Sequence, residues 1–194
     1  MTEPIKILAF AGSNRKESIN RKLIKAAADI AQEELKLAVT VITLKDYPLP
    51  IYDGDEEETD GAPANLAKLK QLIADHDAVL IASPEYNASV TGLLKNTLDW
   101  ISRPAGENDP GKVMKEKPVA LLSASPGGLG GIRALNHLRA ILLNTGTLVI
   151  PAQFALSNAH QAFAEDGHLK VDSARNAITE LLKQLQRIAN GLKA

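Results

Sequence analysis

The stretch from Ile7 to Leu23, ILAFAGSNRKESINRKL, decides the fold and carries the first sign of a function. A short apolar run ends at Gly12, a polar loop follows, and an amphipathic segment then begins. This order predicts a buried strand that leads through a loop into the start of a helix. The unpaired N–H groups and the dipole at a helix start favour an anion. The stretch therefore predicts a phosphate site, with an ordinary strand-to-helix turn as the open alternative.

The side chains of this first loop, residues 12–20, suit a single phosphate. Arg15 brings a fixed positive charge and a planar set of N–H donors. Ser13, Ser18 and Asn20 add further hydrogen-bond donors. The loop contains neither G-x-G-x-x-G nor G-x-x-x-x-G-K-[ST], the usual patterns for dinucleotides and nucleoside triphosphates. A terminal monophosphate, such as that of flavin mononucleotide (FMN), fits this loop better than a pyrophosphate.

Composition narrows the class of protein. The 194 residues suffice for one domain with a sizeable core, so we expect a single domain over residues 1–194. The net charge of −1 lacks the basic excess of proteins that bind nucleic acids or anionic membranes. Cysteine is absent, which excludes disulfides, thiolate metal sites and a cysteine nucleophile. Without a signal-like or membrane-spanning run, we expect a cytoplasmic protein.

Apolar runs and segments of helical period alternate along the chain. The runs expected as buried strands are Ile5–Ala11, Val39–Leu44, Ala78–Ser83, Val119–Ser123 and Leu148–Ile150. The segments expected as helices are 20–36, 63–75, 90–101, 130–144 and 171–191. This α/β alternation favours a parallel sheet that is covered by helices on both faces.

Other conspicuous features are interpreted without a catalytic role. The acidic run 53–60, DGDEEETD, is expected as a solvated loop. Residues 106–112, GENDPGK, begin like a nucleotide-binding loop, but Val113 stands where Ser or Thr must hold the metal, so a plain loop is expected. The histidines show no ligand spacing and no partner, and we expect neither catalysis nor a metal site from His76, His137, His160 and His168.

In an open parallel sheet, ligands bind at the carboxyl ends of the strands, so the loops after the first, third and fourth strands should converge. The second loop is Ser83–Gly92, SPEYNASVTG, and the third is Ser123–Gly131, SASPGGLGG. The second loop offers peptide groups for the polar edge of a ring system and Tyr86 for its apolar body. The glycines of the third loop allow close backbone approach, with a mobile connection as the alternative.

Together, the three loops resemble the NADPH-dependent FMN reductase family. The resemblance rests on GSNRKESINRKL, SPEYNASVTGLLKNTLDW and SASPGGLGG, and P-E-Y-N followed by G-x-L-K-N-x-x-D-W is the most specific part. It covers roughly residues 5–150. It implies a flavodoxin-like three-layer sandwich whose five-stranded parallel sheet has the order 2-1-3-4-5. The family includes chromate and quinone reductases and related azoreductases.

The resemblance also implies a place for FMN in this chain. Its phosphate would be held by Ser13, Arg15, Ser18, Ile19 and Asn20. The ring and the ribityl chain would be bordered, mostly through main-chain groups, by Pro84, Glu85, Tyr86 and Asn87. The other edge of the ring would be covered by Ser123, Ser125, Pro126, Gly127 and Gly128. No side chain is given a catalytic role, because the cofactor carries the chemistry.

For function, the resemblance implies that NADPH or NADH reduces FMN, which passes two electrons in ping-pong order to a quinone, an azo compound, chromate or free flavin. A flavodoxin-like electron carrier and a non-catalytic regulatory protein stay open. Carriers are strongly acidic and place aromatic side chains around the ring, unlike a chain with net charge −1 and 4% aromatic residues. Family members are homodimers or homotetramers, and Leu93, Leu94 and Trp100 are candidates for the interface or for burial within the subunit.

Overall fold

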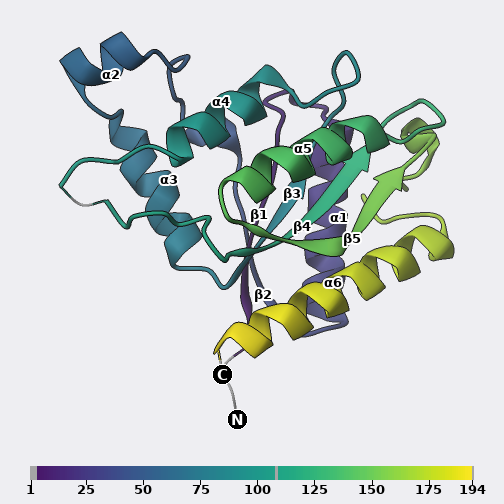
Figure 1. Cartoon of the computed structure of the whole chain (residues 1–194). Helices are drawn as coiled ribbons and strands as arrows, with labels where there is room; N and C mark the ends of the chain where they lie inside the picture. The colour runs from purple at the N-terminus through teal and green to yellow at the C-terminus, as the bar shows by residue number, and fades with distance from the viewer. Residues whose placement is uncertain (1–3, 108, 194) are drawn as a thin grey trace.

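Five parallel strands form the centre of the structure, a computed structural model that describes residues 4–107 and 109–193. The sheet has the order β2-β1-β3-β4-β5, which confirms the predicted topology (Figure 1). Its members are β1 (Lys6–Ala11), β2 (Ala38–Val41), β3 (Ala78–Ala82), β4 (Pro118–Ala124) and β5 (Leu148–Leu156). Each neighbouring pair is parallel, so all the carboxyl ends of the strands lie at one edge of the sheet.

Helices cover both faces of the sheet, which completes the predicted three-layer sandwich. One face carries α1 (Ile19–Glu33) and α6 (Asp172–Lys193). The other carries α3 (Ala64–Ala74), α4 (Gly92–Ile101) and α5 (Ile132–Asn144). The remaining helical pieces are η1 (Leu44–Asp46), α2 (Gly54–Asp60) and η2 (Ala159–Gln161). No helix in the described ranges has the length and apolar character needed to cross a membrane.

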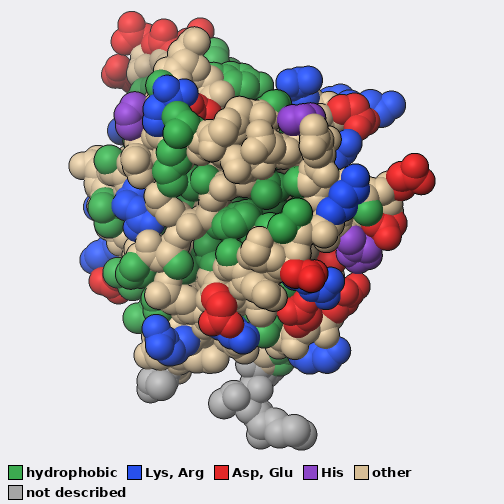
Figure 2. Space-filling model, turned by 90° about the vertical axis from the view of Figure 1, so that its right-hand side faces the viewer, with side chains coloured by type: hydrophobic (Ala, Val, Ile, Leu, Met, Phe, Trp, Pro, Cys, Tyr) green, Lys and Arg blue, Asp and Glu red, His purple; other side chains and the backbone are tan. Residues whose placement is uncertain are grey.

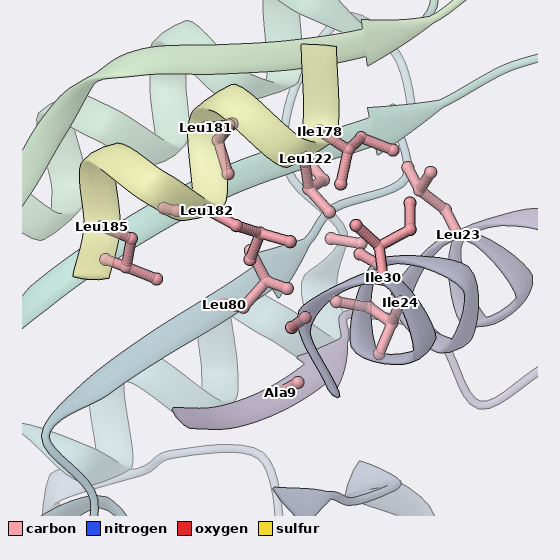
Figure 3. Packing of buried hydrophobic residues seen from close by; sticks show 14 of the residues in the cluster. Ala9, Leu23, Ile24, Ile30, Leu80, Leu122, Ile178, Leu181, Leu182 and Leu185 are labelled. Atoms are coloured by element: carbon pink, nitrogen blue, oxygen red, sulfur yellow. The ribbon is translucent and has the colours of Figure 1, made fainter. Parts of the chain in front are cut away.

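The core is divided by the sheet into two apolar clusters, because successive side chains of a strand point to opposite faces. Figure 3 shows the cluster between the sheet and the helices α1 and α6. Its labelled side chains are Leu23, Ile24 and Ile30 of α1, Ile178, Leu181, Leu182 and Leu185 of α6, and Ala9, Leu80 and Leu122 of the strands. The second cluster, on the opposite face, includes Phe10 and Trp100, and this double burial holds the strand ends in fixed positions.

Strand β5 continues past the predicted end at Ile150, through Pro151 to Leu156. Its pairing with β4 shifts between Val119 and Leu121 of β4, and Pro151 lies in the shifted part of β5. Because β5 is an edge strand, the missing N–H of proline is tolerated there. The irregular backbone is held by two side chains: Arg139 Nη1 donates to the Ile150 carbonyl at 2.9 Å, and Gln184 Oε1 accepts from the Ala152 N–H at 3.0 Å.

The acidic run 53–60 was predicted as a loop, and this prediction was wrong, because residues 54–60 form α2. Asp53 caps the helix by accepting a hydrogen bond from the Asp55 N–H at 2.9 Å. Glu57 accepts from Arg103 Nε at 2.8 Å and from the Tyr52 hydroxyl at 3.1 Å. The side chains other than Glu57 are exposed, so the helix depends on its cap and on this one contact with the body of the protein.

Residues 106–112 form a loop, as predicted, although residue 108 lies outside the described residues. The ammonium group of Lys70 on α3 forms an ion pair with Asp109 and also donates to the Arg103 carbonyl at 2.8 Å. Lys70 is only 2% exposed, so these contacts satisfy a buried charge. The loop is therefore fastened to α3 and has a structural explanation.

Two of the candidate interface residues are buried within their own chain. Leu94 is fully buried, and Trp100 is 2% exposed. The Trp100 indole N–H donates to the Pro50 carbonyl at 2.8 Å, and the ring meets Tyr52 edge-on with 5.1 Å between centroids. This burial corrects the interface assignment of Leu94 and Trp100 and leaves the half-buried Leu93 as a candidate.

Candidate active site

The first and second loops meet where the neighbouring strands β1 and β3 end. The Gly12 N–H donates to the Ala82 carbonyl at 2.9 Å, and the Thr91 hydroxyl donates to the Gly12 carbonyl at 2.8 Å. A Cβ atom at Gly12 would lie 2.9 Å from the Leu94 Cβ, so only glycine allows α4 to approach this closely. The strands β1 and β3 are neighbours in the sheet, but the helices that follow them, α1 and α4, cover opposite faces. Folds of this kind bind ligands at this point of the sheet.

Figure 2 shows the side of the molecule toward which β4 and β5 point in Figure 1. Hydrophobic side chains gather in the middle of this face, and charged side chains surround them. Two of the large exposed apolar side chains belong to the site loops: Tyr86 is 48% exposed and Leu129 is 57% exposed. Their exposure gives this part of the molecule apolar surface that a ring system or a second subunit can cover.

The first loop is bent by local hydrogen bonds that leave its charge at the surface. Ser13 Oγ accepts from the Arg15 N–H at 3.3 Å, and Ser18 Oγ accepts from the Arg21 N–H at 3.4 Å, which caps α1. Ile19 lies in the first turn of α1, where backbone N–H groups have no intrahelical acceptor. Arg15 is exposed and pairs with no acidic side chain in the described ranges. These donors suit the monophosphate of FMN.

Asn20 and Ser123 make hydrogen bonds to the backbone of the protein. Asn20 Nδ2 donates to the Ala124 carbonyl at 2.9 Å, and Asn20 Oδ1 accepts from the Ala124 N–H at 2.9 Å. Ser123 is fully buried, and its hydroxyl donates to the Gly130 carbonyl at 2.8 Å. Asn20 thus joins α1 to the end of β4, and Ser123 holds the third loop at Gly130, while contacts of either residue with a ligand stay a prediction.

The second loop contains a tight hairpin at Tyr86–Ser89. Tyr86 and Ser89 exchange two backbone hydrogen bonds, both of 3.0 Å. Between them, Asn87 and Ala88 have φ angles of 50° and 61°, the two left-handed residues of a type I′ turn. Asparagine accepts this conformation readily, whereas alanine adopts it at a cost. The turn presents its peptide groups next to the exposed Tyr86 ring, as a main-chain binding loop requires.

The third loop depends on two buried glycines and exposes two others. Gly130 has φ 62°, and a Cβ atom there would lie 2.8 Å from the backbone carbon of Ala155. Gly131 has φ 93° and would place a Cβ atom 3.0 Å from that of Ser123. Gly127 and Gly128 are exposed, and the Gly127 N–H donates to Ser125 Oγ at 3.1 Å. The turn from Ser125 through Pro126 to Gly128 therefore offers an accessible backbone, which fits a planar ligand.

Two residues of α5 to which the sequence analysis gave no role contact the second loop. Arg133 Nε donates to Glu85 Oε1 at 2.7 Å, and the Arg133 N–H donates to Glu85 Oε2 at 3.1 Å. The Arg133 guanidinium holds the pKa of the Glu85 carboxyl below its ordinary value. One turn further along α5, His137 Nδ1 lies 2.9 Å from Ser89 Oγ. This contact places His137 beside the second loop and does not test the expectation that it has no catalytic role.

A large groove lies on the side of the first loop that is nearer to β2. It has a volume of about 780 Å³ and runs between α1 and the segment that follows β2. Basic side chains that line it include Lys16, Arg21 and Lys25, and Ser18 connects it to the first loop. The groove lies on the β2 side of β1, whereas sheets of this kind bind their ligands between the carboxyl ends of β1 and β3.

Comparison with known proteins identifies the family of this chain. Residues 5–161 match the model of the NADPH-dependent FMN reductase family. An NAD(P)H-dependent FMN reductase of Pseudomonas aeruginosa is 35% identical over 188 residues, which cover 96% of each chain. An NADPH:quinone oxidoreductase of Arabidopsis thaliana is 35% identical over 187 residues, 94% of this chain and 90% of that protein.

A solved structure agrees with these relatives. The flavoenzyme FerB, an NAD(P)H:(acceptor) oxidoreductase of Paracoccus denitrificans, superposes with a TM-score of 0.80 at 31% identity. The superposition covers 96% of this chain and 98% of FerB. The match of the family model spans the first, second and third loops, so it includes every element of the site described above. The chain belongs to the NADPH-dependent FMN reductase family.

Proposed function

We propose that this protein is an oxidoreductase in which FMN takes a hydride from NADPH or NADH and passes two electrons, in ping-pong order, to a quinone, an azo compound, chromate or free flavin. Family membership supports the enzyme class, the cofactor and the nicotinamide donor. The observation that carries the proposal is that the ends of β1, β3 and β4 are joined: Thr91 of the second loop bonds to Gly12, and Asn20 of the first loop bonds to Ala124 at the end of β4. It joins phosphate donors and accessible peptide groups in one site.

The residues of the chain bind and orient the cofactor in this proposal. Arg15, Ser13 and Ser18 hold the phosphate together with the backbone N–H groups of Ile19 and Asn20, because a helix start favours an anion. The main chain of residues 84–87 and of residues 125–128 borders the ring on two sides. Hydride transfer needs a defined distance and orientation between donor and acceptor, and rigid loops supply both.

The direct test is an absorbance spectrum of the purified protein, followed by anaerobic titration with NADPH. We expect a flavin absorption band at about 450 nm. Its intensity should fall as two electrons are added per flavin, without a stable one-electron state. A stable one-electron state would favour an electron carrier. Heat release and chromatography then identify the cofactor, and recovery of FAD alone would contradict the FMN assignment.

We further propose a homodimer or homotetramer whose flavin sites open near a subunit boundary. The exposed Tyr86 and Leu129 support this, since both lie in the site loops and a partner subunit would cover them. Closed two-fold pairing is the commonest way to achieve such cover. Light scattering should give a mass at least twice 20.7 kDa. A fully active monomer at micromolar concentration would show that one chain encloses its own site.

A further inference from the structure

The second loop and α5 are joined by two contacts one helical turn apart, which we call the α5 clasp: Glu85 with Arg133, and Ser89 with His137. The partners are 48 residues apart in the sequence in both pairs. On α5, Arg133 and His137 are four positions apart and so lie on the same face of the helix. The clasp therefore contacts the second loop both before and after the two left-handed residues of the turn, at Glu85 and at Ser89.

Glu85 also caps the start of α5, which has no capping side chain of its own. The helix begins after Gly131, which has no side chain to cap the first turn. Glu85 Oε2 accepts hydrogen bonds from the N–H groups of Arg133, at 3.1 Å, and Ala134, at 3.3 Å. A carboxylate is favoured at this end of a helix by the dipole. The side chain is only 9% exposed, so its charge is satisfied inside the protein by these donors.

The position of the clasp matters because the hairpin between its two contacts is a costly conformation. Ala88 has φ 61°, which alanine adopts only where the surroundings impose it. The surroundings include the pair of hydrogen bonds within the turn and the two contacts of the clasp. Without the clasp, the hairpin would lose its side-chain connections to α5.

We propose that Glu85 is a positioning residue: through Arg133 and the start of α5, it holds the hairpin of the second loop in the conformation that binds FMN. Glu85 acts through the backbone of the loop and not by its own charge on the ring. The inference rests on the proposed function for the identity of the ligand. The holding of the hairpin is a property of the flavin-free chain and is tested separately.

The first measurement is amide hydrogen exchange in the flavin-free protein. Glu85→Gln and Arg133→Met should each speed exchange of the Tyr86 and Ser89 N–H groups at least about tenfold, since the local opening becomes easier. The matched control is Glu34→Gln, which breaks a comparable carboxylate–arginine pair with Arg175, where Nε lies 2.6 Å from Oε1. Glu34 follows α1 at its far end, about 22 Å from the first loop. Unchanged exchange in both clasp variants would overturn the proposal.

The second measurement is FMN affinity in a double-mutant cycle. Each single clasp variant should raise the dissociation constant about ten- to hundredfold, the range of a hydrogen bond to a charged group. The double variant should be no weaker than the weaker single variant, because both changes remove the same contact. Additive losses, or an unchanged affinity in Arg133→Met, would show that Glu85 acts on the flavin directly and contradict the proposal.

The spectrum of bound flavin provides a readout that a general loss of stability would not move. At saturating FMN, the clasp variants should show a visible absorption band that is broader and has less resolved shoulders than that of the wild type. Glu34→Gln should keep the wild-type band. Thermal unfolding of each variant confirms that it is folded, and Arg133→Met carries the test if Glu85→Gln does not fold. If the wild-type protein itself binds no FMN, the proposed function fails, and hydrogen exchange alone then decides whether the clasp holds the hairpin.

Discussion

The first loop and the pair formed by the second and third loops lie at the same edge of the sheet but are held in different ways. The first loop has long-range hydrogen bonds only at its two ends, at Gly12 and Asn20. The hydrogen bonds that bend its middle, from Ser13 to Ser18, join residues at most six positions apart, such as Arg21 Nη1 to the Arg15 carbonyl. The second loop is bound to α5 across 48 positions. The difference teaches that the proposed ring side of the site is held by tertiary contacts, whereas the middle of the proposed phosphate side is a local loop whose donors an anion would satisfy.

The largest effect should come from the third loop, where packing leaves no room. Gly130→Ala would force a Cβ atom to within 2.8 Å of the Ala155 backbone in a left-handed conformation. We expect a loss of about 2–5 kcal/mol in the free energy of unfolding, measured by urea titration. Gly128→Ala is the control, because it meets no atom within 4 Å, and should change stability by about 0.5 kcal/mol or less. Equal stability of both variants would contradict the rigidity of this loop.

The second largest effect is expected in the first loop, at Arg15. Arg15→Ala should weaken FMN binding about ten- to hundredfold, because a charge-assisted hydrogen bond contributes about 1.5–3 kcal/mol. Hydride transfer in FMN-saturated protein should change little, since Arg15 is proposed to hold the phosphate and not the ring. Fluorescence titration and stopped flow separate the two quantities. Lys16→Ala is the control, and an equal loss there would mean that the net charge of the loop, and not Arg15, holds the phosphate.

A smaller effect is expected at His137, the histidine that contacts the site. His137→Gln should lower the rate of flavin reduction by NADPH less than about tenfold, because hydride transfer needs no protein acid or base. Stopped-flow absorbance measures this rate. His76, whose ring nitrogens contact the Leu72 carbonyl at 2.6 Å and Thr40 Oγ1 at 2.8 Å, provides a structural control. A drop beyond about a hundredfold in FMN-loaded His137→Gln would be of general-base size and would identify a catalytic residue.

The smallest effect concerns pH. The pKa of the Glu85 carboxyl is lowered in the folded protein, and the hydrogen bond from Arg133 is the largest cause. The folded state therefore binds a proton at Glu85 less readily than the unfolded state does. The resulting stability is present above the ordinary glutamate pKa and is lost as the pH falls below about 4. We expect about 1 kcal/mol or less, since Arg133 is 54% exposed. Unfolding curves of wild type and Glu85→Gln should therefore converge in acid, and parallel curves would exclude this contribution.

The sequence predicted the framework of the sheet because buried parallel strands are continuous apolar runs. It failed at α2, where Glu57 pairs with Arg103, 46 residues away, a contact that no local pattern contains. It also ended β5 too early, since Pro151 is a strand breaker except at an edge, and the edge position follows only from the complete topology.

At the candidate site, the sequence predicted which loops follow β1, β3 and β4, but not the hydrogen bonds that individual side chains make within the protein. Asn20 and Ser123 are polar residues in the right loops, yet both bond to backbone groups that the fold brings to them. Arg133 and His137 carried one signal, their four-residue spacing on a helix next to a glycine loop. That spacing identifies a shared face, but only the folded chain shows that Glu85 and Ser89 lie opposite.

The irregular part of β5 has a consequence for how the molecule meets other copies of itself in solution. An exposed edge strand is a template on which another chain can add a strand by backbone pairing, a route to aggregation. Here Pro151 offers no N–H group, the Ala152 N–H is taken by Gln184, and the Ile150 carbonyl is taken by Arg139. The β5 edge of the sheet therefore lacks free backbone partners in its middle, which opposes the addition of a strand from another molecule at this edge.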